Sequence, residues 1–482
     1  MVLLLPFLAC VAAPPEPPEP PEPVDSGDPV APITLARRGG DHHSAALHVD
    51  TPMEVTCRDE AGEDPRPALY VEEDVVLRGL LAGSTYRCEG ADGAATYTTP
   101  PLPEDLPLAT LVTPDDDAGW HLVNLVDAAG GWIVILDAQG RVRWALPGER
   151  FLGGLDATWM DQGVLFGGEG VAPTLVDLDQ NVLWRADVTL ASPDEKPGGW
   201  NHDAGPAADH QSVYALSNEN IVHGDGNLVS HTLGFVVKQI SLVDGSLLWA
   251  WSSTVDGAGL LEPVGADPFH ANAVWDVGDL VLVNLRNMSQ ILGIERSTRA
   301  VRWRLGRDGD FALVEADGTP AAPERWFLYE HDTKLIDGLL YVFDNSMEFA
   351  DPTRVLVLAI DEEARTARIV REWTRLYDGQ PWHAMGWGGL DPLEDGGLSV
   401  AFGIRGEVPS SLFHLDAASD AITWEIEFDL DVGLYRSERF DPFYVSDTFF
   451  ESPSMRVGAA PHGDGALELG RVVGDGRGAT RR

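Results

Sequence analysis

Cysteine is nearly absent from this sequence. The chain of 482 residues has three cysteines, Cys10, Cys57 and Cys88. Three cysteines in total are too few for a cysteine-based zinc site, which excludes the small zinc modules that depend on thiolate ligands. Cys57 and Cys88 can form one disulfide if the chain enters an oxidising compartment.

Basic residues are also few. Lysine and arginine number 33 against 77 aspartates and glutamates, which gives a formal net charge of -44. This charge argues against nucleic acid and anionic lipid as partners, because both need a basic surface. We interpret it as a solvated acidic surface that aids solubility. An anionic ligand would then need a local cationic pocket, which gives weight to any arginine inside the fold.

The apolar run at the start of the sequence is short. It reads MVLLLPFLAC and is too brief to span a membrane. It resembles the end of a bacterial lipoprotein signal peptide with Cys10 as the lipidated residue, and a plain cleaved signal peptide is the alternative. Both predict export to the periplasm or the cell surface. The following PPEPPEPPEP favours extended polyproline II, so residues 1–30 predict a signal and a semi-rigid spacer.

Residues 31–104 show short alternations of apolar and polar residues, separated by glycine-containing turns. Tyr86 stands two residues before Cys88, as in the tyrosine corner of immunoglobulin-like sandwiches. The core tryptophan of antibody domains is missing, so we predict a small fibronectin-like β-sandwich with a structural role. His42 and His43 are expected to form a solvated loop pair rather than a metal site.

The rest of the chain repeats one pattern six times: an apolar alternation, an acidic turn and a closing tryptophan. The six closing residues are Trp144, Trp184, Trp249, Trp303, Trp373 and Trp424. Turn chemistry such as Asp-Gly predicts a β-hairpin for each copy, and the spacing of 40 to 70 residues fits a four-stranded blade. Residues 105–455 therefore predict a six-bladed β-propeller whose tryptophans pack between blades. The tail at 456–482 is predicted to be disordered.

Histidine recurs just before four consecutive repeats. His202, His270, His331 and His383 precede the third to the sixth copy. A lone histidine is usually structural, but histidines at equivalent repeat positions point at one axis, because the inner strands of a propeller surround a central channel. We predict that these side chains converge at the mouth of that channel.

Short polar motifs surround these histidines. They read HD at 202–203, HANAV at 270–274, LRNMS at 285–289, EHD at 330–332 and FDNS at 343–346. In the same order they are similar to the HD, HxN(S/A)V, SRNQS, QHT and FDNG motifs of the bacterial arylsulfate sulfotransferase family. The order and spacing of the motifs carry the resemblance, which covers most of residues 31–455.

The resemblance implies an enzyme that moves a sulfuryl group from a phenolic sulfate ester to another phenol by a ping-pong mechanism. Carried over by motif, His331 is the nucleophile that becomes sulfurylated, and His270, Arg286 and His202 hold the sulfuryl group. Further substrate contacts are expected from Asn272, Asn287, His383 and Asn345. This chemistry suits the residue types, because a neutral imidazole can attack sulfur and leave again, and a guanidinium fork matches an oxyanion.

Other properties follow from the same resemblance. Trp200, Phe269, Tyr329 and Trp382 are expected to line the phenol ring, with ordinary packing as the alternative for each. No cofactor and no metal are expected, and the sequence has no G-x-x-x-x-G-K-[ST] phosphate loop. A homodimer is an expected assembly, because the family includes dimers.

Three alternatives stay open. The segment DGSLLW at 244–249 also resembles the tryptophan-docking repeats of quinoprotein propellers, although this explains neither the histidines nor Arg286. A non-catalytic binding propeller displayed on a cell surface is the second alternative. A metal site made by the converging histidines is the third.

Overall fold

The computed structural model describes residues 33–38, 42–128, 130–148, 155–160, 162–187, 199–223, 230–257, 265–346, 352–377, 379–384, 386–403, 408–442 and 444. This part is all-β, apart from the short 3-10 turns η2 (Arg286–Met288) and η3 (Pro323–Arg325). No helix in it is long and apolar enough to cross a membrane. The segment 1–30 with Cys10 and the tail 456–482 lie outside the described residues.

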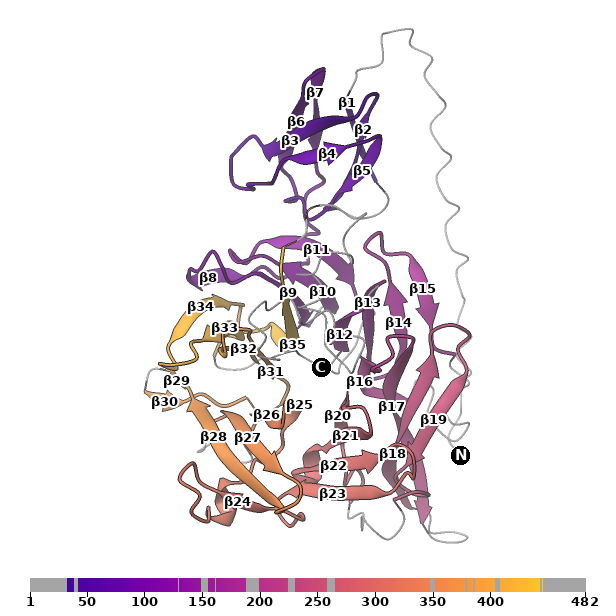
Figure 1. The fold of residues 1–482 in the computed structure, drawn as a ribbon, viewed down its shortest axis with the longest axis vertical. Helices are drawn as coiled ribbons and strands as arrows, with labels where there is room; N and C mark the ends of the chain where they lie inside the picture. The colour runs from indigo at the N-terminus through magenta and orange to yellow at the C-terminus, as the bar shows by residue number, and fades with distance from the viewer. Residues whose placement is uncertain are drawn as a thin grey trace, which may run out of the picture.

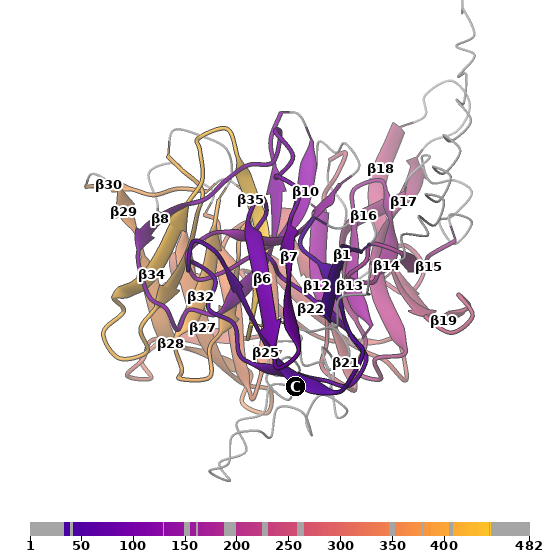
Figure 2. The same cartoon turned by 90° about the horizontal axis from the view of Figure 1, so that it is seen from above.

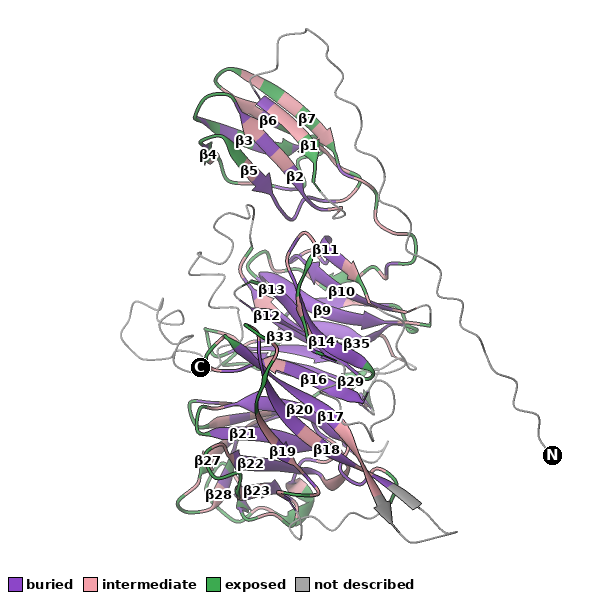
Figure 3. Cartoon of the chain, turned by 90° about the vertical axis from the view of Figure 1, so that its right-hand side faces the viewer, coloured by how far each residue is buried: buried purple, intermediate pink, exposed green. Residues whose placement is uncertain are grey.

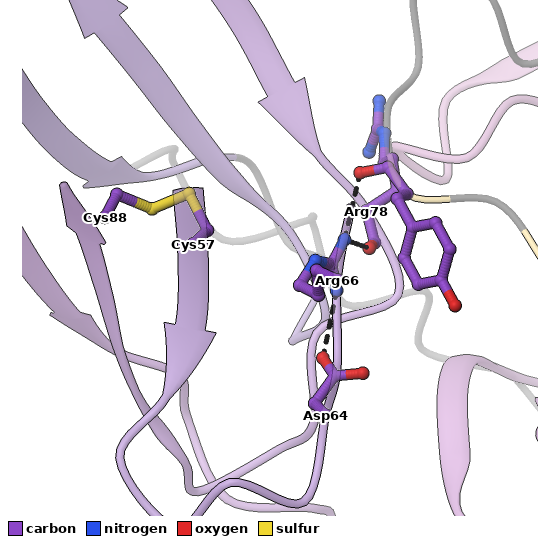
Figure 4. Close-up of a disulfide and its surroundings, with 6 residues drawn as sticks. Cys57, Asp64, Arg66, Arg78 and Cys88 are labelled. Atoms are coloured by element: carbon purple, nitrogen blue, oxygen red, sulfur yellow. Dashed lines mark hydrogen bonds and ion pairs between the residues drawn. A yellow bond between two sulfur atoms is a disulfide. The ribbon is translucent and has the colours of Figure 1, made fainter. Parts of the chain in front are cut away.

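The N-terminal part contains two small antiparallel sheets. One has the order β1-β2-β5 and the other the order β4-β3-β6-β7. Their bounds are β1 (Ile33–Arg37), β2 (Ala45–Val49), β3 (Met53–Asp59), β4 (Leu69–Val71), β5 (Asp74–Leu77), β6 (Thr85–Gly90) and β7 (Gly93–Thr98). A disulfide joins Cys57 on β3 to Cys88 on β6, as predicted (Figure 4). The hydroxyl of Tyr86 accepts a hydrogen bond from the Leu81 N–H, the backbone contact that a tyrosine corner makes.

The remaining described residues form six sheets of four or five strands, together with the short pair β29 (Leu376–Tyr377) and β30 (Gln380–Pro381). The first sheet has β11 (Val142–Pro147), β10 (Gly131–Leu136), β9 (Trp120–Val126) and β35 (Gly433–Phe440). The second has β12 (Leu155–Met160), β13 (Gly163–Gly168), β14 (Val171–Val176) and β15 (Val182–Arg185). The third has β16 (Trp200–Pro206), β17 (Ser212–His223), β18 (Ser230–Ser241) and β19 (Leu247–Ser252).

The last three sheets continue in chain order. The fourth has β20 (Ala271–Asp276), β21 (Leu280–Leu285), β22 (Gln290–Glu295) and β23 (Val301–Gly306). The fifth has β25 (His331–Ile336), β26 (Leu339–Asp344), β27 (Arg354–Asp361), β28 (Thr366–Thr374) and β24 (Ala312–Val314). The sixth has β31 (Gly389–Pro392), β32 (Leu398–Phe402), β33 (Ser411–Leu415), β34 (Ile422–Glu427) and β8 (Thr110–Thr113).

One strand of each sheet contacts its counterparts in the two neighbouring sheets. The contacts run from β12 to β16, β20, β25, β31 and β35, and then from β35 back to β12. Figure 1 shows the sheets following one another around a common centre, with the N-terminal sheets next to β11 at one edge, and Figure 2 shows the same arrangement from above. Burial is high along strands such as β9 and β20 and low on outer strands such as β15 (Figure 3).

Each of the six tryptophan repeats is an antiparallel hairpin, as the turn chemistry predicts. Four of the closing indoles donate a hydrogen bond to a carbonyl in the hairpin turn of the next sheet. The pairs are Trp144 with Leu178, Trp249 with Arg296, Trp373 with Asp420, and Trp424 with Ala138. The last pair joins the sixth sheet to the first, so these tryptophans fasten neighbouring sheets together.

Candidate functional site

The three central histidines lie where inner strands begin, and the register of each strand shifts there. In β16 the pairing with β17 jumps from Asn201 to Ala204, which leaves His202 in a bulge with a φ of +34°. His270, with a φ of +47°, directly precedes β20, whose pairing shifts around Asn272. β25 begins at His331 and shifts over the next three residues. Such bulges re-aim side chains, and they recur next to active sites.

The bulge also separates the histidine from the aspartate that follows it. Asp203 accepts a hydrogen bond from the Val274 N–H at 2.6 Å, and Asp332 accepts one from the Leu390 N–H at 2.9 Å. Each aspartate therefore forms a hydrogen bond with the inner strand of the next sheet. In each His-Asp pair the aspartate ties sheets together, and the histidine remains available for the site.

His202 and His270 meet directly. Their Nε2 atoms are 3.0 Å apart, although the chain separates the residues by 68 positions. The other nitrogen of His270, Nδ1, lies 2.6 Å from a carboxylate oxygen of Asp267, which also accepts the His270 backbone N–H. The side chain of His202 is almost fully buried, whereas those of His270 and Asp267 are 26% and 35% exposed. The pair thus runs from the interior to the solvent edge.

His331 is buried beside these residues and is held from the other side. Its Nδ1 lies 2.7 Å from Oδ1 of Asn345 at the end of β26. The amide nitrogen of Asn345 donates to the carbonyls of Ala384 and Trp387, at 2.8 and 2.9 Å. The segment that contains these carbonyls packs against His331, because a Cβ on Gly386 would lie 3.8 Å from its Cε1 atom.

Arg286 supplies the guanidinium of the site. Its NH1 donates to Oδ1 of Asn287, and its guanidinium carbon lies 4.5 Å from the centre of the Tyr329 ring. The amide of Asn287 donates in turn to the Asp267 carbonyl at 2.7 Å. The guanidinium is therefore oriented by the same turn that carries the partner of His270.

Electrostatic effects couple these groups and keep the deeper imidazoles neutral. Burial, followed by Arg286, lowers the pKa of His331 well below 6.5. The hydrogen bond with Asn345 raises this pKa but is outweighed, and Arg436 and His270 lower it further. Burial also lowers the pKa of His202, with further contributions from His270 and His331. Burial lowers the pKa of Arg286, but the group stays charged at neutral pH. His331 and His202 are thus neutral imidazoles beside a permanent cation.

A charged cluster that no sequence motif predicts adjoins the histidines. Arg436 on β35 contacts Asp156 at 2.9 Å and Asp203 at 3.2 Å, and donates to the Asn272 carbonyl. Lys334 contacts Asp332 and Asp391 at 2.9 and 2.7 Å. No repeat motif contains Arg436, and its partners lie more than 100 residues away, so only the closure of the fold brings them together.

A cavity of about 50 Å³ lies within this cluster and is also lined by Glu438. Burial raises the pKa of Glu438 to about 8 and that of Asp156 well above its ordinary value. The cavity is far smaller than the roughly 300 Å³ of small-molecule pockets. We therefore interpret the cluster as the support of the histidines rather than as the place of an aryl ring.

The other residues predicted for the site are polar or aromatic. Among the polar residues, Asn272 donates to the Glu330 carbonyl and Asn287 accepts from Arg286, so both amides make contacts within the protein. His383 is half-buried and precedes the segment that packs on His331. Of the aromatic residues, Tyr329 contacts Arg286. The other three, Trp200, Phe269 and Trp382, pack inside hydrophobic clusters, as the packing alternative predicts.

Two further carboxyl groups were missed from the sequence. Asp267 bonds His270 from three residues upstream, a spacing that a search for carboxylates around each histidine would have found. Glu330 directly precedes His331 and is fully buried, and burial raises its pKa well above the ordinary value. Among the described residues, no group of three or more histidine, cysteine, aspartate or glutamate side chains is arranged to hold a metal ion.

Comparison with known proteins finds one matching family model. Residues 235–388 match the family model described as "Arylsulfotransferase (ASST)", a segment that contains His270, Arg286, His331 and Asn345. No curated protein matches the chain.

Similar solved structures include a protein of unknown function from Bacteroides caccae, with 14% identity, 66% of this chain and 98% of that chain covered, and a TM-score of 0.43. Citrobacter koseri AztD has 11% identity, coverage of 80% and 98%, and a TM-score of 0.33. Hydrazine synthase of Kuenenia stuttgartiensis has 11% identity, coverage of 73% and 91%, and a TM-score of 0.33. At these values the likenesses carry no argument about function.

Proposed function

We propose that this chain, whose residues 235–388 match the arylsulfotransferase family model, is an arylsulfate sulfotransferase that works through a sulfohistidine. The donor is a phenolic sulfate ester and the acceptor is another phenol. The transfer is ping-pong, and it uses neither a nucleotide nor a metal.

One observation carries the proposal. Imidazoles from three consecutive sheets and one guanidinium lie close together. His202 and His270 are in contact, and Arg286 packs on the Tyr329 ring two residues before His331. Asn272, two residues after His270, bonds the carbonyl of Glu330 next to His331. Sulfuryl transfer resembles phosphoryl transfer, in which in-line positioning and stabilisation of charge on the equatorial oxygens dominate catalysis. A neutral imidazole beside a fixed cation provides a nucleophile and an oxyanion partner.

In the first half-reaction, Nε2 of His331 attacks the sulfur of the aryl sulfate. The N–S bond forms while the S–O bond to the aryl group breaks, and the electron pair leaves with the phenolate oxygen. Arg286 and the histidine pair hold the sulfuryl oxygens, and an imidazolium of that pair returns a proton to the phenolate. In the second half-reaction an acceptor phenol loses its proton to the same pair, its oxygen attacks sulfur, and the N–S bond breaks.

The rest of the molecule fits this function as a scaffold. We interpret the six sheets as the blades of a six-bladed β-propeller at residues 105–455, and the two small sheets at 31–104 as a fibronectin-like sandwich. Export of the chain by residues 1–30, with Cys10 as a lipid anchor, is part of the same proposal. A homodimer is the proposed assembly.

The experiment is a colorimetric assay with a chromogenic phenyl sulfate and added phenol. His331→Ala is expected to lower kcat by about 1,000-fold or more, because the nucleophile is lost. The matched control is His48→Ala, which removes a histidine that bonds Asp74 on the N-terminal sheets and should leave turnover unchanged. Full activity of His331→Ala would refute the assignment. No turnover of any aryl sulfate by the wild type would favour the binding propeller instead.

A further inference from the structure

In two of the three central histidines, His331 and His270, the Nδ1 atoms face chemically different acceptors. His331 faces the neutral amide oxygen of Asn345, and His270 faces the carboxylate of Asp267. The Nδ1 partner decides which nitrogen of an imidazole carries the proton and how well the ring bears a positive charge. The difference therefore bears on what each histidine can do.

The orientation of the Asn345 amide is fixed by its second contact. Its nitrogen donates to two backbone carbonyls, Ala384 and Trp387. A flipped amide would place oxygen against both carbonyl oxygens and lose these hydrogen bonds. The oxygen of Asn345 must therefore face His331, and because it can only accept, Nδ1 of His331 carries the proton. The lone pair of the neutral ring is then on Nε2.

The partner of His270 stays ionised. Burial by itself would raise the pKa of Asp267, but the hydrogen bonds from His270 and the nearby Arg286 hold it below the ordinary value. Nδ1 of His270 is thus the donor to Asp267, and its Nε2 faces His202. A carboxylate in this position stabilises the imidazolium that forms when Nε2 takes up a proton. The partial exposure of His270 also allows its proton to exchange with solvent.

We propose that Asn345 and Asp267 are positioning residues that divide the work between the histidines. Asn345 holds His331 as a neutral nucleophile with a free Nε2, and Asp267 makes His270 the group that gives a proton to the leaving phenolate and takes one from the acceptor. This proposal rests on the proposed function and assigns Asn345 a role on the nucleophile instead of on the substrate.

A neutral acceptor at His331 suits the covalent step. Once Nε2 bonds sulfur while Nδ1 keeps its proton, the ring is positively charged and is a good leaving group for the second half-reaction. A carboxylate at Nδ1 would favour protonation of the free ring at Nε2, which removes the nucleophile. Arg286, Arg436 and His270 oppose this protonation. The amide of Asn345 favours it only through its hydrogen bond and, unlike a carboxylate, adds no negative charge.

The role of Asp267 is tested by single-turnover sulfurylation with a series of aryl sulfates whose phenols differ in acidity. Asp267→Asn should slow the reaction about 100-fold for the sulfate of a weakly acidic phenol but less than about threefold for that of a nitrophenol, which leaves without a proton. The matched control is Asp74→Asn, which removes the carboxylate partner of His48 outside the site. An equal loss across the series would overturn the role of Asp267.

The role of Asn345 is tested by the pH dependence of the same reaction with the nitrophenyl sulfate. Asn345→Asp should move the acidic limb upward by about one pH unit or more, because a carboxylate favours protonated His331. An unchanged limb in a variant that still becomes labelled would overturn the role of Asn345.

In Asn345→Asp a carboxylate oxygen would face two backbone carbonyl oxygens, and the variant can misfold. Nitrogen-15 NMR of histidine-labelled wild type therefore gives an independent test. The His331 signal, identified by its loss in His331→Ala, should show protonated Nδ1 and bare Nε2, and the opposite tautomer would overturn the role of Asn345. If wild type is never sulfurylated, the proposed function fails. If it is sulfurylated on His331 and these dependences are absent, only the division of roles fails.

Discussion

At the scale of single residues, the site depends on backbone conformations that most side chains avoid. His202 and His270 have positive φ angles, and Asp332, next to His331, has a φ of +47°. Non-glycine residues in this region carry strain that persists only where the surrounding structure fixes it, and such strain is concentrated at functional sites. The aspartates that bond the next inner strand provide part of this fixation.

The depressed pKa of His331 predicts how activity depends on pH. Burial and Arg286 place this pKa well below 6.5, so the neutral nucleophile persists as the pH falls through the range in which free histidine becomes charged. With a nitrophenyl sulfate as the donor, the single-turnover rate should be constant from pH 8 to 6.5, the ordinary histidine value, and fall only below it. A titration with its midpoint at or above 6.5 would contradict the neutral, buried state of His331.

Much of the histidine arrangement was predictable, because the repeat spacing places His202, His270 and His331 at equivalent points of successive sheets. The partners of the rings were not. The contact of Asn345 with the His331 ring was not predicted, because which way an amide faces depends on backbone carbonyls such as Ala384, which no motif specifies.

At the scale of elements, the hairpins follow from local chemistry and the closing strands do not. Each outer hairpin pairs residues close in sequence across a turn with at least one acidic residue, and so alternation and turn residues predict it. β35 pairs with β9, and β8 pairs with β34, across more than 300 residues. Nothing in a local pattern shows which distant strand completes a sheet, and so Arg436 was missed.

The buried ion pairs of β35 predict a large effect of Arg436→Met. This change leaves the Asp156 and Asp203 pair without its cation, and should lower the free energy of unfolding by about 3–5 kcal/mol. The measurement is urea unfolding followed by tryptophan fluorescence.

The control for this prediction is Arg302→Met. Arg302 makes partly exposed ion pairs with Asp279 and Glu295, and its loss should cost less than about 1 kcal/mol. Equal losses of stability for the two variants would show that the charged cluster around Arg436 does not stabilise the fold as we describe.

At the scale of the whole molecule, the chain is strongly acidic, but several of its basic side chains are buried in the interior. The net charge is -44, yet Arg436 and Lys334 are buried among carboxylates and Arg286 is half-buried next to the histidines. An acidic surface does not attract an anion, so recognition of the sulfate ester that we propose as the donor would depend on this interior charge. Indole hydrogen bonds between neighbouring sheets, from Trp144 around to Trp424, hold the ring that brings these groups together.

The central claim is that His331 carries the sulfuryl group between donor and acceptor. The most direct measurement is mass spectrometry of peptides after the wild type has been incubated with an aryl sulfate and no acceptor. We predict that the peptide containing His331 gains the mass of one sulfuryl group and loses it when a phenol is added. A peptide that stays unmodified while the enzyme turns over, or a sulfuryl group found on another residue, would contradict the account.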